Sequence, residues 1–285
     1  MSEYQYFEFQ SIARPLTQLE MRELRSYSSR ATITSTRFVN EYQWGNFKGD
    51  PKRWIEKYFD TFFYVANWGT RQLMLRLPRH LVDLKAVRRY CCADAARVWR
   101  TAEHVVFNFQ SQNDEAEDWA EANAPLAALI PLRAELARGD YRCLYLAWLS
   151  CVQAGEVAAE TEEPPIPAGF RALSGALCAF AEFFHIDAHL IAAAAERAPR
   201  QDGRLARKQL ERSIQSLPDA KRTQLLLELI RQDPNQRQRL LTKFRDNRGP
   251  GRHSAHAERT VAQLLRAARQ RAERSEARGS RTTRP

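Results

Sequence analysis

Two short segments in the N-terminal third carry the side chains best suited to binding a ligand or a partner. Each follows a predicted strand, and together they supply the candidate residues Trp44, Lys48, Asp50, Asn67, Trp68 and Arg71. Aromatic rings beside Arg and Lys are what stacking on a nucleobase or anchoring a peptide requires. In the structural alternative, the tryptophans close the ends of the core, Asp50 caps a helix and Asn67 turns the chain. The structural alternative is favoured, because Trp and Asn commonly serve packing and turns.

The sequence has no motif of an enzyme of known mechanism. The patterns G-x-S-x-G, G-x-x-x-x-G-K-[ST], G-x-G-x-x-G and H-E-x-x-H are all absent. The five cysteines have no C-x-x-C spacing, so they indicate neither a zinc site nor a disulfide framework. His185 and His189 lie four residues apart but lack a third ligand. We therefore assign no catalytic residue, no metal and no cofactor.

The excess of positive over negative charge lies in the C-terminal third of the chain. The 285 residues have a formal net charge of +10, yet residues 197–285 alone hold 23 Lys and Arg against 9 Asp and Glu. Such an asymmetry indicates a folded body with an extension for an anionic partner, although solvated Arg-rich helices have the same composition. The candidate contacts are Arg245, Arg248, Arg252, Arg259, Arg266, Arg269, Arg271 and Arg274. Arginines in such rows bind phosphates, and docking on an acidic protein is an equal alternative.

The elements that would position these residues predict an α+β fold. Residues 1–112 alternate strand and helix signals, which predicts a mixed or antiparallel sheet with covering helices. The predicted strands are Tyr4–Gln10, Ala31–Tyr42, Phe62–Ala66, Gln72–Leu77 and His104–Phe109. Between them, helices begin at a capping box of Thr17 with Glu20, at the Asp50-Pro51 pair and at Asp83.

The rest of the chain reads as helical. Residues 113–124 form an acidic loop, which is an alternative internal partner for the basic extension. Residues 125–247 form an all-helical region, interrupted by an extended Pro-rich linker over 161–168. Residues 248–285 hold a basic helix, from Ala257 to Arg274, and a disordered tail. The apolar stripe of this last helix is too thin to be buried without a neighbour.

Four stretches of the chain resemble a family of uncharacterised bacterial proteins. They are Tyr-Gln-Tyr-Phe-Glu-Phe at 4–9, Trp-Gly-Asn-Phe-Lys-Gly-Asp-Pro at 44–51, Ala-Asn-Trp-Gly-Thr-Arg at 66–71 and Leu-Ile-Pro-Leu-Arg-Ala-Glu-Leu at 129–136. The resemblance covers most of residues 4–200 and implies a bacterial protein. The family has no established activity, so no residue role is carried over from it.

These observations predict a non-enzymatic interaction or adaptor protein whose basic extension holds an anionic partner. The alternative is an enzyme or small-ligand-binding protein with a site near Trp44 and Trp68. We expect a protein partner, with nucleic acid as the second partner class, and the sequence does not define the oligomeric state. The sequence shows no signal segment and no apolar run near the roughly 20 residues that cross a bilayer, so we expect a cytoplasmic protein without membrane contact.

Overall fold

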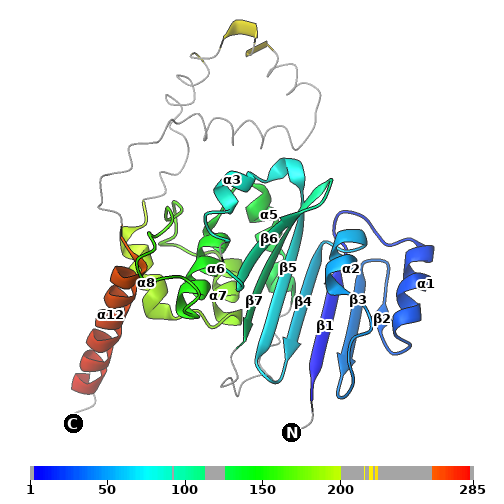
Figure 1. Ribbon diagram of the computed structural model, residues 1–285, viewed down its shortest axis with the longest axis horizontal. Helices are drawn as coiled ribbons and strands as arrows, with labels where there is room; N and C mark the ends of the chain where they lie inside the picture. The colour runs from blue at the N-terminus through cyan, green and yellow to red at the C-terminus, as the bar shows by residue number, and fades with distance from the viewer. Residues whose placement is uncertain are drawn as a thin grey trace.

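The centre of the molecule is a seven-stranded antiparallel sheet with strand order β2-β3-β1-β4-β5-β7-β6 (Figure 1). The computed structural model describes residues 3–91, 93–112, 126–199 and 259–282, and a few residues between 215 and 223. The strands are β1 Gln5–Gln10, β2 Thr32–Ile33, β3 Arg37–Tyr42, β4 Thr61–Ala66, β5 Thr70–Pro78, β6 Ala96–Arg100 and β7 His104–Gln112. The α+β prediction, with helices following the sheet, is confirmed.

Helices cover both faces of this sheet. Those of the N-terminal part are α1 Gln18–Tyr27, α2 Pro51–Lys57, the short 3-10 helix η1 Arg79–Leu81 and α3 Leu84–Val87. The later ones are α4 Leu126–Leu129, α5 Pro131–Ala137, α6 Arg142–Gln153, α7 Gly175–Phe183, α8 Ala188–Arg197 and α12 Val261–Thr282. No helix of the described ranges is both long enough and apolar enough to span a bilayer.

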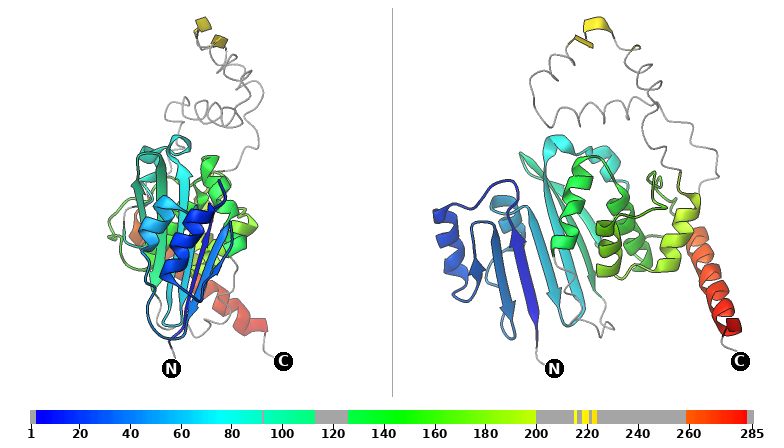
Figure 2. Two further views of the ribbon diagram at one scale, coloured as in Figure 1. Left: turned by 90° about the vertical axis from the view of Figure 1, so that its right-hand side faces the viewer. Right: turned by 180° about the vertical axis from the view of Figure 1, so that it is seen from behind.

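The two helical layers lie on opposite faces and are offset along the sheet. On β4, Phe62 points into an aromatic core under α1 and α2, while Phe63 and Val65 point into a larger core under α4–α8. Seen from behind, the helices after the sheet cover its β4–β7 half, and β1 and β3 lie beside them (Figure 2). Because successive side chains of a strand point to opposite faces of the sheet, β4 contributes to both cores.

The predicted helix starts are confirmed. Thr17 accepts a hydrogen bond from the Glu20 N–H at 3.2 Å, and the Glu20 carboxylate accepts one from the Thr17 N–H at 2.7 Å. Asp50 Oδ1 accepts from the N–H groups of Lys52 and Arg53 at 2.9 and 3.2 Å. Asp83 caps α3 in the same manner. Each cap satisfies amides that the first turn of a helix leaves without partners.

The predicted second strand, Ala31–Tyr42, is two strands. Thr34 to Thr36 form a turn, in which the Thr34 N–H donates to the Arg37 carbonyl at 2.8 Å, so β2 folds back on β3. The turn was not predicted, because this stretch is rich in β-branched residues and contains no Gly or Pro to indicate a turn. The prediction also omitted β6, whose sequence Ala-Arg-Val-Trp-Arg has only a short apolar alternation.

The C-terminal predictions need two corrections. The Pro-rich stretch is non-helical as predicted, but it is packed, because Glu162 pairs with Thr260 in an isolated β-bridge. Helix α12 continues to Thr282, beyond the predicted end at Arg274, since Ala, Arg and Glu favour helix without an apolar anchor. The acidic segment 113–124 and most of 200–258 lie outside the described residues.

Gly49 is required by a close approach of two aromatic rings. A Cβ at this position would lie 2.7 Å from both the Phe47 and Trp54 rings. We expect Gly49→Ala to lower the free energy of unfolding by about 1–3 kcal/mol, because these rings are part of the aromatic core and must shift. Gly175, at the start of α7, has open space around the same position. Urea unfolding of Gly175→Ala is the control, and equal effects of the two variants would contradict the packing argument.

Candidate functional site

The two candidate tryptophans lie at the same end of the sheet, here called the tryptophan end, where β3 and β4 finish and β5 begins. Trp44 follows β3, and Trp68 lies in the turn between β4 and β5. Their exposed fractions are 68% and 39%. Asn67 fixes the turn to the start of β1, because its Oδ1 accepts a hydrogen bond from the Tyr4 N–H at 2.9 Å. Two accessible indoles therefore flank β1.

Lys48 and Asp50 are separated from the tryptophan end by the path of the chain. Phe47 stacks on Phe7 at 4.7 Å between ring centroids and packs against Phe9, so the segment after Trp44 rises over the sheet face. Asp50 is then occupied in capping α2. Both side chains are exposed. They do not complete a polar site around the indoles.

Arg71 was expected beside the tryptophans, and that expectation is wrong. Its exposed fraction is 5%, and its guanidinium donates to the Phe183 carbonyl at 2.7 Å at the end of α7. Burial lowers the pKa of this guanidinium. Residue 71 is adjacent to an exposed turn in sequence, but strand alternation directs it under α7. Its role is to hold α7 on the sheet.

The basic residues of the C-terminal third fall into three groups. Arg245, Arg248 and Arg252 lie outside the described residues. Arg266, Arg269 and Arg274 are exposed on α12. Arg271 is half-buried and pairs with Glu196 at the end of α8. Arg259 is buried before the start of α12.

Arg259 is an internal anchor, which corrects its assignment as a partner contact. Its guanidinium binds both oxygens of the Glu163 carboxylate at 2.6 and 2.7 Å, and the two side chains are only 7% and 6% exposed. The third nitrogen donates to the Ala193 carbonyl at 3.1 Å. The Tyr145 hydroxyl donates to Glu163, and burial keeps the pKa of Tyr145 well above its ordinary value. Bidentate pairing of this kind fixes geometry as well as charge.

A second buried ionic cluster surrounds Asp60. Its Oδ2 accepts from the N–H groups of Ile12 and Ala13, both at 2.7 Å. Its Oδ1 lies 3.2 Å from the Arg76 guanidinium and 3.4 Å from that of Arg133. Sequence reasoning missed this cluster, since a single Asp between two apolar runs gives no signal of four partners. Its contacts connect the segment after β1 to β5 and α5.

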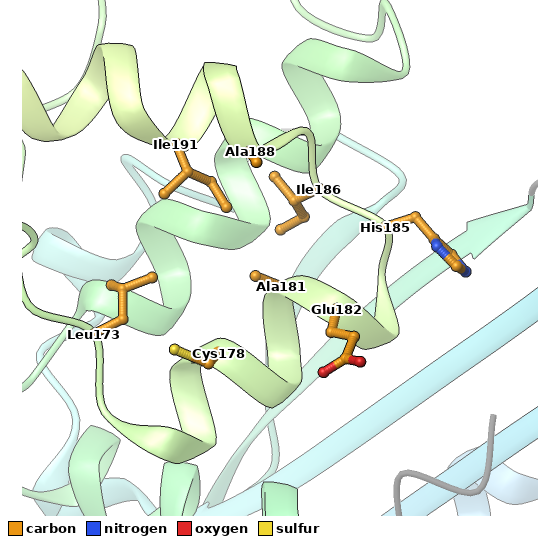
Figure 3. A pocket seen from close by; sticks show the side chains of 8 residues that line it. All are labelled: Leu173, Cys178, Ala181, Glu182, His185, Ile186, Ala188 and Ile191. Carbon is orange, nitrogen blue, oxygen red and sulfur yellow. The ribbon is translucent and has the colours of Figure 1, made fainter. Parts of the chain in front are cut away.

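A pocket of about 490 Å³ lies between α7 and α8 and is mainly apolar. It contains Cys178, Glu182 and His185, which are residue types that serve nucleophilic catalysis. Figure 3 shows Cys178 and His185 at opposite ends of the pocket, with the imidazole directed away from it. The two side chains therefore do not form a nucleophile and base pair.

Among the described side chains, no three His, Cys, Asp or Glu residues are grouped closely enough to hold a metal ion. The four cysteines within the described ranges, Cys91, Cys143, Cys151 and Cys178, form no disulfide with one another. No protein-family model matches the chain, and neither a curated protein nor a solved structure shows significant similarity to it.

Proposed function

We propose that the chain is a non-enzymatic interaction protein of the bacterial cytoplasm that holds an anionic partner on α12. The observation that carries the proposal is the division of this helix between an anchored side and a basic side. Val261, Leu264 and Ala268 are buried against α8, and the Arg259–Glu163 pair fixes the helix start. Figures 1 and 2 show α12 extending away from the body beside α8.

The exposed arginines follow the helical repeat on the other side of α12. Arg266, Arg269 and Arg274 are spaced three and five residues apart, and none of them pairs with an acidic residue in the described part of the chain. At 3.6 residues per turn they lie away from the stripe of Val261 and Leu264. A rigid helix that presents several cations favours binding to phosphates or to an acidic protein surface.

The alternative function, a ligand site near Trp44 and Trp68, is supported by the exposure of both indoles. Its proposed polar groups are occupied elsewhere, because Asp50 caps α2 and Arg71 binds the end of α7. An aromatic surface without convergent polar groups suits partner contact better than small-molecule recognition. We therefore place the interaction function first.

The test is a variant that removes the exposed charge of α12 and keeps its helix. We expect Arg266→Gln/Arg269→Gln/Arg274→Gln to weaken salt-sensitive binding to a mixed-sequence DNA duplex or to poly-glutamate. For the duplex, the slope of log affinity against log salt should fall by about 0.9 per lost phosphate contact. Fluorescence anisotropy measures both probes, and circular dichroism checks that α12 remains helical.

The matched control removes the same charge near α1. Arg22, Arg25 and Arg30 are exposed, and none forms an ion pair with a residue that the structure describes. We expect Arg22→Gln/Arg25→Gln/Arg30→Gln to bind both probes as the unchanged protein does. The proposal fails if neither probe binds the protein, or if the α12 variant and this control behave alike.

A further inference from the structure

The sheet end opposite the tryptophans carries a second concentration of positive charge. Here β5 and β6 finish and β7 begins, with Pro78 opposite His104 and Arg100 opposite Val105. Helix η1 is attached to the turn between β6 and β7, because the Arg79 N–H donates to the Glu103 carbonyl at 2.8 Å. Figure 1 shows α3 beside the same ends of β5 and β6. Segments from both sides of α3 therefore meet here.

Five cations of this region are exposed and make no ion pair with any described residue. They are Arg79, Lys85, Arg88, Arg89 and Arg100, here called the sheet-end basic surface. Of the three acids between residues 79 and 103, Asp83 caps α3 and Asp94 pairs with Arg97. Only Glu103 remains at the turn. Residues 79–103 thus hold six Lys and Arg against three Asp and Glu, a net charge of +3, although the first 196 residues together are slightly acidic.

The base of this surface is fixed by the core. Val87 and Tyr90 are buried in the core under α6. The exposed side chains of Lys85, Arg88 and Arg89 come from the same short segment. The Tyr90 hydroxyl donates to the Pro165 carbonyl at 2.8 Å, which ties the segment to the packed Pro-rich stretch. Cations held on an ordered backbone lose less conformational freedom on binding than cations on a free chain.

We propose that the sheet-end basic surface binds the phosphate backbone of a double-stranded nucleic acid without regard to sequence. Its five cations are of the type that phosphate contacts require. An acidic protein is the less suitable partner, because protein interfaces centre on large apolar anchors. The large apolar side chains that the structure shows exposed, Ile12, Leu19, Tyr27, Trp44 and Trp68, all lie outside this surface.

This inference does not rest on α12. The five cations come from η1, α3 and its C-terminal flank, and β6, whereas the proposed function concerns the arginines after Leu265. A duplex can contact one surface, the other or both. The two proposals are therefore tested by separate variants.

The test variant is Lys85→Gln/Arg88→Gln/Arg89→Gln, read by anisotropy with a labelled mixed-sequence DNA duplex over a series of salt concentrations. We expect the affinity at low salt to fall roughly tenfold or more, and the salt slope to fall by about 3, at roughly 0.9 per phosphate. Because exposed Lys and Arg are replaced by Gln of similar length, the folded state should be kept. The thermal midpoint of each variant checks this.

A second variant, Arg79→Gln/Arg100→Gln, keeps the test informative if the triple variant does not fold. It removes charge from η1 and β6 without altering α3, and we expect a smaller loss in the same direction. The Arg22→Gln/Arg25→Gln/Arg30→Gln protein is the control for total charge and should bind as the unchanged protein does. A control that loses as much affinity as the triple variant would overturn the proposal.

Two further results would also overturn it. One is unchanged duplex affinity in both surface variants, even if the α12 variant loses binding, which would leave the proposed function in place. The other is a larger loss of poly-glutamate affinity than of duplex affinity in the surface variants, which would assign the surface to an acidic protein. A loss with the surface variants alone would support this inference and count against α12 as the contact.

Discussion

Replacing Arg259 by methionine is expected to lower the free energy of unfolding by about 3–5 kcal/mol and to loosen α12 from α8. Among the described residues, the change leaves the buried Glu163 carboxylate with the Tyr145 hydroxyl as its one side-chain donor, so an uncompensated charge remains inside the protein. The Ala193 carbonyl also loses the donor that the Arg259 guanidinium supplies. Chemical denaturation measures the loss, and hydrogen exchange of the α12 amides reports the loosening.

A double variant separates the unpaired charge from the missing contact. In Arg259→Met/Glu163→Gln the buried charge is gone, and the glutamine oxygen still accepts from Tyr145. We expect this protein to recover roughly half or more of the stability lost in the single variant. If single and double variants unfold alike, the pair contributes through packing alone and the charge argument is wrong.

Replacing Asp60 by alanine should be comparably severe, with a loss of about 3–5 kcal/mol. Two backbone N–H groups, of Ile12 and Ala13, would lose their acceptor, and the Arg76 guanidinium would lose its counter-charge. Asp60→Asn keeps an oxygen for the amides but removes the charge, so we expect an intermediate loss. Urea unfolding of the three proteins at neutral pH gives the ranking, and an alanine variant as stable as the asparagine variant would contradict it.

The same carboxylate makes part of the stability pH-dependent. Burial alone would raise the pKa of Asp60, but the two backbone N–H groups and the two guanidinium groups outweigh it and hold this pKa below its ordinary value. The stabilisation is therefore complete above the unfolded pKa of about 3.9 and is lost as pH falls through the lower folded value. The stability difference between the protein and Asp60→Asn should be constant near neutrality and shrink below about pH 4.

Local signals in the sequence were sufficient for much of the sheet half. The reciprocal bonds of Thr17 and Glu20 and the Asp50 cap depend on residues three or fewer apart, so the sequence pattern contains them in full. The strict alternation along β5 likewise identified a strand with two different faces. The turn at Thr34 to Thr36 escaped because its residues also suit strands.

The candidate site was less predictable, because its decisive contacts join distant residues. Arg71 meets Phe183 across 112 positions, and Arg259 meets Glu163 across 96. Arg71 was predicted to lie beside Trp68 because the two residues are close in sequence. Arg259 was predicted to contact a partner because it lies in the basic C-terminal third. In both cases the fold uses the arginine internally. The sheet-end basic surface was not predicted, because the net charge of the first 196 residues is negative and conceals a local excess of positive charge.

The docking of α12 on α8 also sets an order of events during synthesis on the ribosome. The side of α8 that carries Leu190, Ala193 and Ala194 is made long before Arg259 and Leu264 emerge. Until then this apolar strip and the Glu163 carboxylate lack their final partners. A nascent chain that has completed its sheet thus still exposes an apolar surface on α8. A chaperone or a neighbouring nascent chain can contact this surface until α12 is synthesised and packs on it.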